Sequence, residues 1–221
     1  MILNQETKNY FEENNYVVIK NFLNTEVSTL AYQYCINKVT SIDFKKSNNI
    51  EKYHKEWDGN FNDTQSPNDY SCYGDVLMES ILSLSTASIE NFIGKNLIPT
   101  YSYWRFYQKN SELKRHIDRP SCEFSATLCL GYNIKNVDKN VYPNYCWPIF
   151  VKNNNNLQEI PIALEPGDLM IYKGCEIEHW REKFLGLNQA QVFLHYNEKD
   201  GKHNIKYDGR PCLSIPKQYQ I

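Results

Sequence analysis

Residues 113–118 read Leu-Lys-Arg-His-Ile-Asp, and residues 169–172, Leu-Met-Ile-Tyr, lead toward a second histidine at position 179. Side chains alternate between the two faces of a β-strand, so His116 and Asp118 share one face. Two imidazoles and one carboxylate can hold a divalent ion and leave three coordination positions open, as in mononuclear iron sites. A His-x-Asp tripeptide alone is a weak signal, since an isolated histidine is usually solvated or packed in a core. Both histidines follow strand-like segments, however, and we predict a metal site at His116, Asp118 and His179.

Short apolar segments separated by turn residues fill the second half of the chain. Residues 100–107 and 124–133 are strand-like, and Pro166-Gly167-Asp168 forms a turn ahead of residues 169–172. Further strands are expected at 147–151, 159–164 and 191–196. Many short strands with regular turn signals are typical of a β-sandwich or barrel.

The first hundred residues read mainly as helix. Periodic apolar residues predict helices at 7–14, 24–38 and 75–94. In the second of these helices, Leu30, Tyr34 and Ile36 are expected to form the apolar face. Residues 16–19 are expected to form a brief strand, and the polar stretch 41–73 is expected to be loops with a short helix. Helices followed by short strands predict one α+β domain in which the helices back a β-sandwich or barrel.

The composition argues against several classes of protein. The 221 residues are 41% hydrophobic and 23% charged, so the chain can bury a core. A net charge of −2 gives no general attraction to nucleic acid or anionic membranes. No apolar run reaches the roughly 18–20 residues of a membrane span, the N-terminal residues lack the pattern of a secretory leader, and the seven cysteines include no Cys-x-x-Cys pair. We therefore expect a cytoplasmic protein with reduced cysteines that binds neither membranes nor nucleic acid.

From Tyr103 to Tyr196 the chain resembles the Fe(II)/2-oxoglutarate-dependent dioxygenases, nearest to their prolyl-hydroxylase-like branch. The matching pieces stand in the family's order: Arg105-Phe106-Tyr107, residues 113–118, residues 165–172, His179-Trp180-Arg181-Glu182 and Gln191-Val192-Phe193-Leu194-His195-Tyr196. The resemblance implies a double-stranded β-helix, or jelly roll, with the N-terminal helices packed on one sheet. It further implies a single dioxygenase domain over residues 1–221, with residues 1–97 as mainly helical support and residues 98–221 as the jelly-roll core.

The resemblance also implies an activity. The protein would be a hydroxylase that uses Fe(II), 2-oxoglutarate and dioxygen, with His116, Asp118 and His179 as the iron ligands. An acid at position 118 disfavours halogenation, because related halogenases carry a small residue there. The prime substrate is not identified by the sequence, and both a peptide side chain and a small molecule remain open.

Family members place a tyrosine and a cation against 2-oxoglutarate, and the cation is where this chain departs from the pattern. Tyr107 matches the tyrosine. The family's Arg or Lys on the last strand is replaced by Gln189, which carries no charge, although the distal carboxylate needs a cation. Arg181 is the first substitute, because two residues beyond His179 means the same face of the strand.

Other residues are expected on the inner face of the barrel. Arg105 is the second substitute for the missing cation, with a structural ion pair as an equal alternative, and Arg119 is the third. Thr127 is expected to touch the cosubstrate. His195 is expected to face inward, either as a hydrogen-bond partner near the metal or as an ordinary core histidine.

Two other readings stay open at the level of the sequence. One is a cupin-like metalloprotein that uses another metal and no 2-oxo acid. The other is a non-catalytic jelly-roll binding module in which the His/Asp set is incidental.

Overall fold

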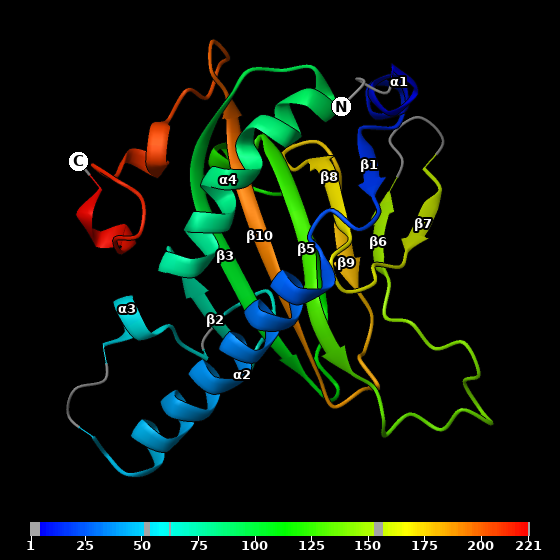
Figure 1. Cartoon of the computed structure of the whole chain (residues 1–221), viewed down its shortest axis with the longest axis vertical. Coiled ribbons are helices and arrows are strands. Elements are labelled where there is room, and N and C mark those ends of the chain that lie inside the picture. The colour runs from blue at the N-terminus through cyan, green and yellow to red at the C-terminus, as the bar shows by residue number, and fades with distance from the viewer. Residues whose placement is uncertain (1–4, 51–53, 62, 153–156, 221) are drawn as a thin grey trace.

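The computed structural model describes residues 5–50, 54–61, 63–152 and 157–220. Helices and strands alternate in the N-terminal part, and strands dominate after Leu97 (Figure 1). The α-helices are α1 (Gln5–Asn14), α2 (Thr25–Ser47), α3 (Lys55–Asp58) and α4 (Val76–Ile93), and the 3₁₀ helices are η1 (Pro120–Cys122), η2 (Lys206–Gly209) and η3 (Lys217–Tyr219). The strands are β1 (Tyr16–Ile19), β2 (Tyr70–Tyr73), β3 (Leu97–Gln108), β4 (Leu113–His116), β5 (Phe124–Asn133), β6 (Ile149–Lys152), β7 (Glu159–Ile162), β8 (Leu169–Lys173), β9 (His179–Arg181) and β10 (Asn188–Glu198).

The strands form two antiparallel sheets that face each other. The larger sheet has the order β1-β8-β5-β10-β3-β2, and the smaller has the order β4-β9-β6-β7. From β3 onward the chain passes repeatedly between the two sheets, which is the topology of a jelly roll. The predicted α+β class and double-stranded β-helix are confirmed.

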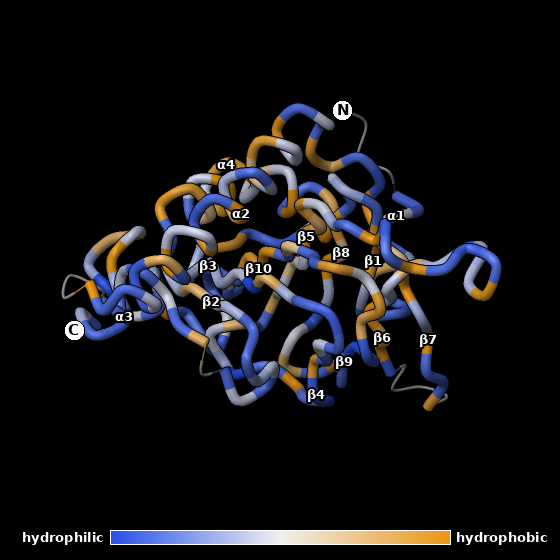
Figure 2. Tube along the Cα trace, turned by 90° about the horizontal axis from the view of Figure 1, so that it is seen from below, coloured by the Kyte–Doolittle hydropathy of each residue, from blue (hydrophilic) through white to orange (hydrophobic). Residues whose placement is uncertain are grey.

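Helices α2 and α4 cover the outer face of the larger sheet, so this part of the molecule has three layers. Figure 2 shows these two helices, the larger sheet and the smaller sheet one below the other. Helix α2 packs on β5, and α4 packs on β3 and β10. Apolar side chains from both helices join those of the sheet in one buried cluster, which includes Leu82, Ile89, Trp104 and Val192. The expected packing of the N-terminal helices on one sheet is therefore confirmed. That residues 1–221 form a single domain stays a prediction.

Helix α2 differs from the sequence prediction in length and in its buried face. It continues through Ser47 rather than ending near residue 38, because Val39 and Ile42 extend its buried stripe along the sheet. That stripe consists of Ala31, Cys35, Val39 and Ile42, while Leu30 is exposed. Residues 31, 35, 39 and 42 have the three- and four-residue spacing of one helix face. Polar residues between them made this pattern hard to recognise in the sequence.

Helix α4 follows the prediction closely. The Asp75 carboxylate accepts hydrogen bonds from the backbone N–H groups of Leu77 and Met78, and Gly94 closes the helix in the left-handed conformation at φ 68°. These are the preferred residue types for the two ends of a helix. The stretch 41–73 was expected to be loops with a short helix, but β2 also lies in it and extends the larger sheet beside β3.

The segment after β10 is held to the helical layer by a buried ion pair. Arg210 donates two hydrogen bonds to Glu79 of α4, with Nη2 at 2.7 Å from Oε1, and both side chains are fully buried. Arg210 also donates to the backbone carbonyls of Thr100 and Ile215. The ion pair therefore connects α4, β3 and the C-terminal segment.

We expect Glu79→Gln to lower the free energy of unfolding by about 3 kcal/mol, because it leaves the Arg210 guanidinium buried without a counter-charge. Urea denaturation of the metal-free protein measures this effect. Lys95→Gln, which removes an exposed ion pair with Glu198, is the control and should change stability by less than about 1 kcal/mol. Equal stability of the Glu79→Gln variant and the unmodified protein would contradict the expectation.

None of the helices in the described residues is long and apolar enough to cross a membrane.

Candidate metal centre

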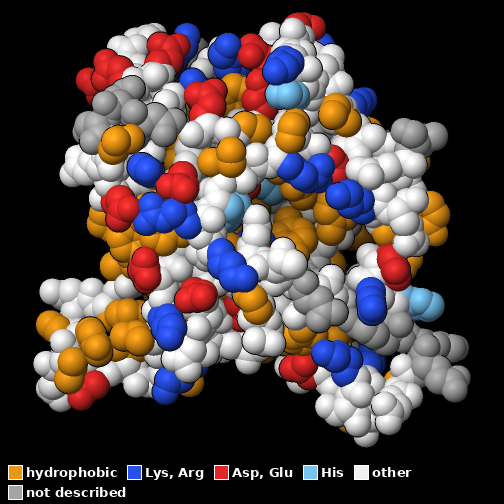
Figure 3. All heavy atoms as spheres, turned by 180° about the vertical axis from the view of Figure 1, so that it is seen from behind, with side chains coloured by type: hydrophobic (Ala, Val, Ile, Leu, Met, Phe, Trp, Pro, Cys, Tyr) orange, Lys and Arg blue, Asp and Glu red, His pale blue; other side chains and the backbone are white. Residues whose placement is uncertain are grey.

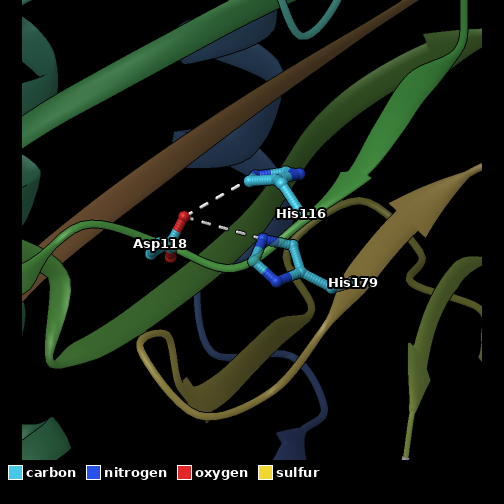
Figure 4. A group of neighbouring side chains, drawn as sticks. All are labelled: His116, Asp118 and His179. Atoms are coloured by element: carbon cyan, nitrogen blue, oxygen red, sulfur yellow. Dashed lines mark ion pairs between the residues drawn. The ribbon is translucent and has the colours of Figure 1, made fainter.

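The pairing of β4 with β9 brings the two predicted histidine ligands together. His116 is the last residue of β4 and His179 the first residue of β9, and the antiparallel register places them directly opposite each other. Their ring centroids are 4.3 Å apart. Asp118 follows β4, and its carboxylate points back toward both rings (Figure 4).

Three ligand atoms converge at this point. Asp118 Oδ1 lies 3.6 Å from His116 Nε2 and 3.7 Å from His179 Nε2. Atoms at these separations can bind one ion placed between them, and the three residues form a group whose ligand atoms lie within 4.8 Å of one another. The structure thus brings together the three residues that the sequence pattern singled out.

Backbone carbonyls fix which ring nitrogen faces the centre. His116 Nδ1 lies 2.7 Å from the carbonyl oxygen of Lys114, and His179 Nδ1 lies 3.0 Å from that of Ile177. A carbonyl only accepts hydrogen bonds, so each Nδ1 carries the proton. Each Nε2 is then left with a lone pair aimed at Asp118, which is the usual arrangement of histidines that bind a metal.

The surroundings keep both imidazoles neutral. Burial lowers the pKa of His179 to about 4, and burial together with the neighbouring His179 lowers the pKa of His116 to about 4. A neutral imidazole is the form that binds a metal ion. Two neutral nitrogens and a carboxylate suit a borderline divalent ion such as Fe(II), so the residues present fit the iron that the sequence resemblance implies.

Two buried histidines, His179 and His195, and the half-buried His116 make the metal-free protein sensitive to acid. The pKa of His116, His179 and His195 lies near 4 in the folded chain, against about 6.5 in the unfolded chain. Between these values the unfolded state binds more protons, so stability is complete above pH 6.5 and falls as the pH drops toward 4. We expect the urea midpoint, measured with a chelator present, to fall between pH 7.5 and pH 5. His195→Asn should reduce this fall, and a midpoint independent of pH would contradict the expectation.

The three residues line a cavity of about 460 Å³. Figure 3 shows the face of the molecule opposite to the helices, where histidine side chains lie in a hollow with Lys and Arg side chains around it. The rings of Tyr73, Tyr101, Tyr103 and Phe193 form part of the cavity wall, together with Arg105 and Lys217. A ligand in this cavity has direct access to the metal centre.

Arg181 lies deeper in the barrel and carries unpartnered donors. Its side chain is 2% exposed, and Nη1 donates to the backbone carbonyl of Trp147 at 2.6 Å. Nε and Nη2 are buried without a hydrogen-bond partner among the described residues. Burial lowers the pKa of Arg181, and no carboxylate in the described part of the chain forms an ion pair with it. A buried guanidinium in this state is stabilised by an anion that enters the barrel.

Tyr107 supplies a second unpartnered donor beside Arg181. Its hydroxyl is buried without a hydrogen-bond partner of good geometry among the described residues, and the nearby Arg105 and Arg181 guanidinium groups offset part of the rise that burial causes in its pKa. The Tyr107 ring packs edge-on against Trp147, with centroids 4.9 Å apart, and the Arg181 guanidinium lies over the same indole at 4.7 Å. The two predicted cosubstrate residues, which stand far apart in the sequence, therefore meet around one tryptophan.

The other candidate cations are already paired. Arg105 Nε donates to the Asp63 carboxylate at 2.7 Å, and Arg105 Nη2 donates to Gln65 at 2.6 Å. Arg119 makes two hydrogen bonds with the Asp208 carboxylate. The sequence analysis did not anticipate Asp63, since it lies in a polar stretch without periodicity and reaches Arg105 only through the fold.

Gln189 and Thr127 face the interior, where they belong to one chain of hydrogen bonds. Gln189 donates to Gln191 at 3.1 Å, and Gln191 donates to Thr127 Oγ1 at 2.7 Å. All three are buried. These residues offer dipoles to the barrel interior but no charge. Of the three candidate cations, Arg181 is the one that forms no ion pair with a carboxylate of the described residues.

No protein-family model matches the sequence, and no curated protein matches it. Solved structures do match in fold. A prolyl-4-hydroxylase from Pseudomonas putida superposes with a TM-score of 0.63 at 12% identity, over 90% of this chain and 99% of that chain. A prolyl hydroxylase from Trichoplax adhaerens, solved with a peptide fragment of the hypoxia inducible factor oxygen degradation domain, gives 0.64 at 15% identity, over 90% and 93%.

A third match comes from Streptomyces hygroscopicus. HygX, solved with nickel, 2-oxoglutarate and hygromycin B bound, superposes with a TM-score of 0.56 at 10% identity, over 89% of this chain and 88% of that chain. At such identities the likeness shows the fold. The chain has the prolyl-hydroxylase-like fold of the 2-oxoglutarate- and Fe(II)-dependent oxygenases, as the sequence resemblance predicted.

Proposed function

We propose that this protein is an Fe(II)- and 2-oxoglutarate-dependent oxygenase that hydroxylates a peptide side chain or a small molecule. The observation that carries the proposal is the convergence of His116 Nε2, His179 Nε2 and Asp118 Oδ1 beside an open cavity. The oxygenase fold supports it, since this centre lies between the two sheets of the jelly roll.

The three residues would hold Fe(II) and leave three positions open for other ligands. Bound together with 2-oxoglutarate and dioxygen, Fe(II) would supply oxidative decarboxylation to succinate and carbon dioxide, coupled to conversion of a substrate C–H to C–OH. The protein's own part is to keep both imidazoles neutral and to orient the carboxylate.

Arg181 and Tyr107 would bind the distal carboxylate of 2-oxoglutarate. The unpartnered Nε and Nη2 atoms of Arg181 offer the paired N–H groups that match a carboxylate, and the Tyr107 hydroxyl offers a third donor. Gln189 and Thr127 would line the same interior space as neutral dipoles. Because Arg105 is paired with Asp63, we assign it to the cavity wall, where it would face the substrate.

Two classes of substrate, a peptide side chain and a small molecule, are compatible with the site. The matched structures include one solved with a peptide and one solved with the small molecule hygromycin B. A cavity of about 460 Å³ is within the range for a drug-sized ligand or for one side chain of a peptide. All seven cysteines are free, which agrees with a reducing compartment, and we propose the cytoplasm as the location.

An anaerobic titration tests the proposal. Fe(II) followed by 2-oxoglutarate should produce the weak visible charge-transfer band of a chelated 2-oxo acid. Metal binding without this band would favour the cupin-like alternative, which uses no 2-oxo acid. Absence of metal binding would favour the non-catalytic binding module and would contradict the proposal.

A further inference from the structure

The second carboxylate oxygen of Asp118 accepts a hydrogen bond from a residue of the larger sheet. Oδ1 is the oxygen that approaches both Nε2 atoms, whereas Oδ2 lies 2.8 Å from the hydroxyl oxygen of Ser125 on β5. A carboxylate accepts hydrogen bonds, so the Ser125 hydroxyl donates its proton to Oδ2.

His195 completes this chain from the neighbouring strand. Ser125 and His195 are direct partners in the pairing of β5 with β10, and His195 Nδ1 lies 2.9 Å from Ser125 Oγ. The serine has a single proton, which it donates to Asp118, so His195 Nδ1 must be the donor in the second hydrogen bond. The order is therefore His195 Nδ1–H to Ser125 Oγ, and Ser125 Oγ–H to Asp118 Oδ2.

The position of His195 is itself fixed by packing. The residue is 5% exposed, and its ring lies against the Tyr101 ring with centroids 4.5 Å apart. Burial lowers the pKa of His195 to about 4, so the ring is neutral near pH 7 and holds one proton, at Nδ1. A neutral ring in a fixed orientation is a directional donor for Ser125.

The backbone on the other side of the carboxylate leaves no room for Asp118 to turn. A Cβ atom at Gly174 would lie 2.5 Å from Asp118 Oδ2 and 2.7 Å from Ser125 Oγ. The Asp118 backbone N–H also donates to the Gly174 carbonyl at 2.9 Å. Glycine at this position allows the turn after β8 to approach the carboxylate closely, and the close approach holds Oδ2 against Ser125.

We propose that His195 and Ser125 are positioning residues that make Asp118 a one-oxygen ligand. The inference rests on the proposed iron site. Two imidazoles and one carboxylate oxygen would leave three positions open on a six-coordinate ion, enough for a chelating 2-oxo acid and one diatomic gas. If Oδ2 were free to bind as well, only two positions would remain, and the gas would compete with the carboxylate.

Nitric oxide, which binds ferrous iron as a dioxygen analogue, measures whether the third position is open. The probe is added to anaerobic protein saturated with Fe(II) and 2-oxoglutarate, and binding is followed by electron paramagnetic resonance. We expect Ser125→Ala and His195→Leu to weaken nitric oxide binding about 10–100-fold, by analogy with the loss of metal affinity or activity when the partner of a metal ligand is removed. His195→Asn keeps an N–H near the position of Nδ1 and should remain within about threefold of the unmodified protein.

The variants separate positioning from a merely structural role. A histidine that only fills space would be replaced better by leucine than by asparagine, and its loss would lower the melting temperature without changing nitric oxide binding. Should His195→Leu fail to fold, Ser125→Ala decides alone, because it removes only one oxygen atom. His54→Asn, at an exposed position, is the matched control.

The result also distinguishes this inference from the proposed function. If the unmodified protein gives no charge-transfer band with Fe(II) and 2-oxoglutarate, the proposed function is wrong. If it gives the band, and both Ser125→Ala and His195→Leu bind nitric oxide as tightly as the unmodified protein, the positioning role is overturned while the iron site stands.

Discussion

Asp118→Ala and His179→Ala are each expected to lower the affinity for Fe(II) at least 1000-fold and to abolish turnover of 2-oxoglutarate. Each change would remove one of the three proposed protein ligands, and water at the open positions cannot replace the lost charge or the lost imidazole. Isothermal titration under anaerobic conditions measures the affinity, and succinate release measures the turnover.

The same variants should keep their fold. Asp118 lies at the cavity wall, and among the described residues its carboxylate has ion-pair contacts only with the two histidines, which are charged only when protonated. We expect the melting temperature of the metal-free variants to stay within a few degrees of that of the unmodified protein. His54→Ala, which removes an exposed histidine, is the control for unspecific loss of metal binding. Unchanged Fe(II) affinity in Asp118→Ala would remove the basis of the proposed function.

Arg181→Leu is expected to raise the Michaelis constant for 2-oxoglutarate at least 100-fold while leaving Fe(II) affinity nearly unchanged. The variant loses two charge-assisted hydrogen bonds to the distal carboxylate, each worth about 1.5–3 kcal/mol. Arg181→Lys should restore little, because an ammonium group does not reproduce the paired donors of the guanidinium. Steady-state kinetics at saturating Fe(II) measures the change.

Arg181→Leu should be more stable than the unmodified protein even though it binds 2-oxoglutarate less tightly. In the ligand-free protein, Arg181 is a buried charge without an anionic partner in the described residues, so leucine is expected to raise the melting temperature. Arg115→Leu is the matched control, since Arg115 lies on the same sheet but on its exposed side, paired with Glu159 and Glu178. An unaltered dependence on 2-oxoglutarate in Arg181→Leu would transfer the role to Arg105, and failure of both would indicate another cosubstrate.

Short-range patterns in the sequence were enough to predict the ends of one helix, two candidate metal ligands and the class of fold. The ends of α4 follow from Asp75 and Gly94, because capping depends on residues a few positions apart. The sequence also singled out His116 and Asp118, which are separated by one residue, but β4 ends at His116, so the irregular backbone after the strand, and not strand alternation, places Asp118 beside the histidines. The class of fold also followed from sequence, since the alternation of turn residues with short apolar runs is repeated through the second half of the chain. The length of α2 and the burial of Leu30 were predicted wrongly, because only contact with β5 shows which of its mixed residues are covered, whereas Tyr34 and Ile36 do pack at the margin of its buried face.

The tertiary structure decided which side chains meet across long stretches of chain. His116 faces His179 because β4 and β9 pair in one particular register, and a shift of one residue would turn His179 to the opposite face. The choice between Arg105 and Arg181 likewise depended on Asp63, which the sequence gives no reason to place beside Arg105. His195 and Ser125 are 70 positions apart and become neighbours only through the pairing of β10 with β5. Backbone geometry determines how residues a few positions apart are oriented, so the sequence reveals it. The contacts at this site depend on sheet register and burial, which are set by the whole chain.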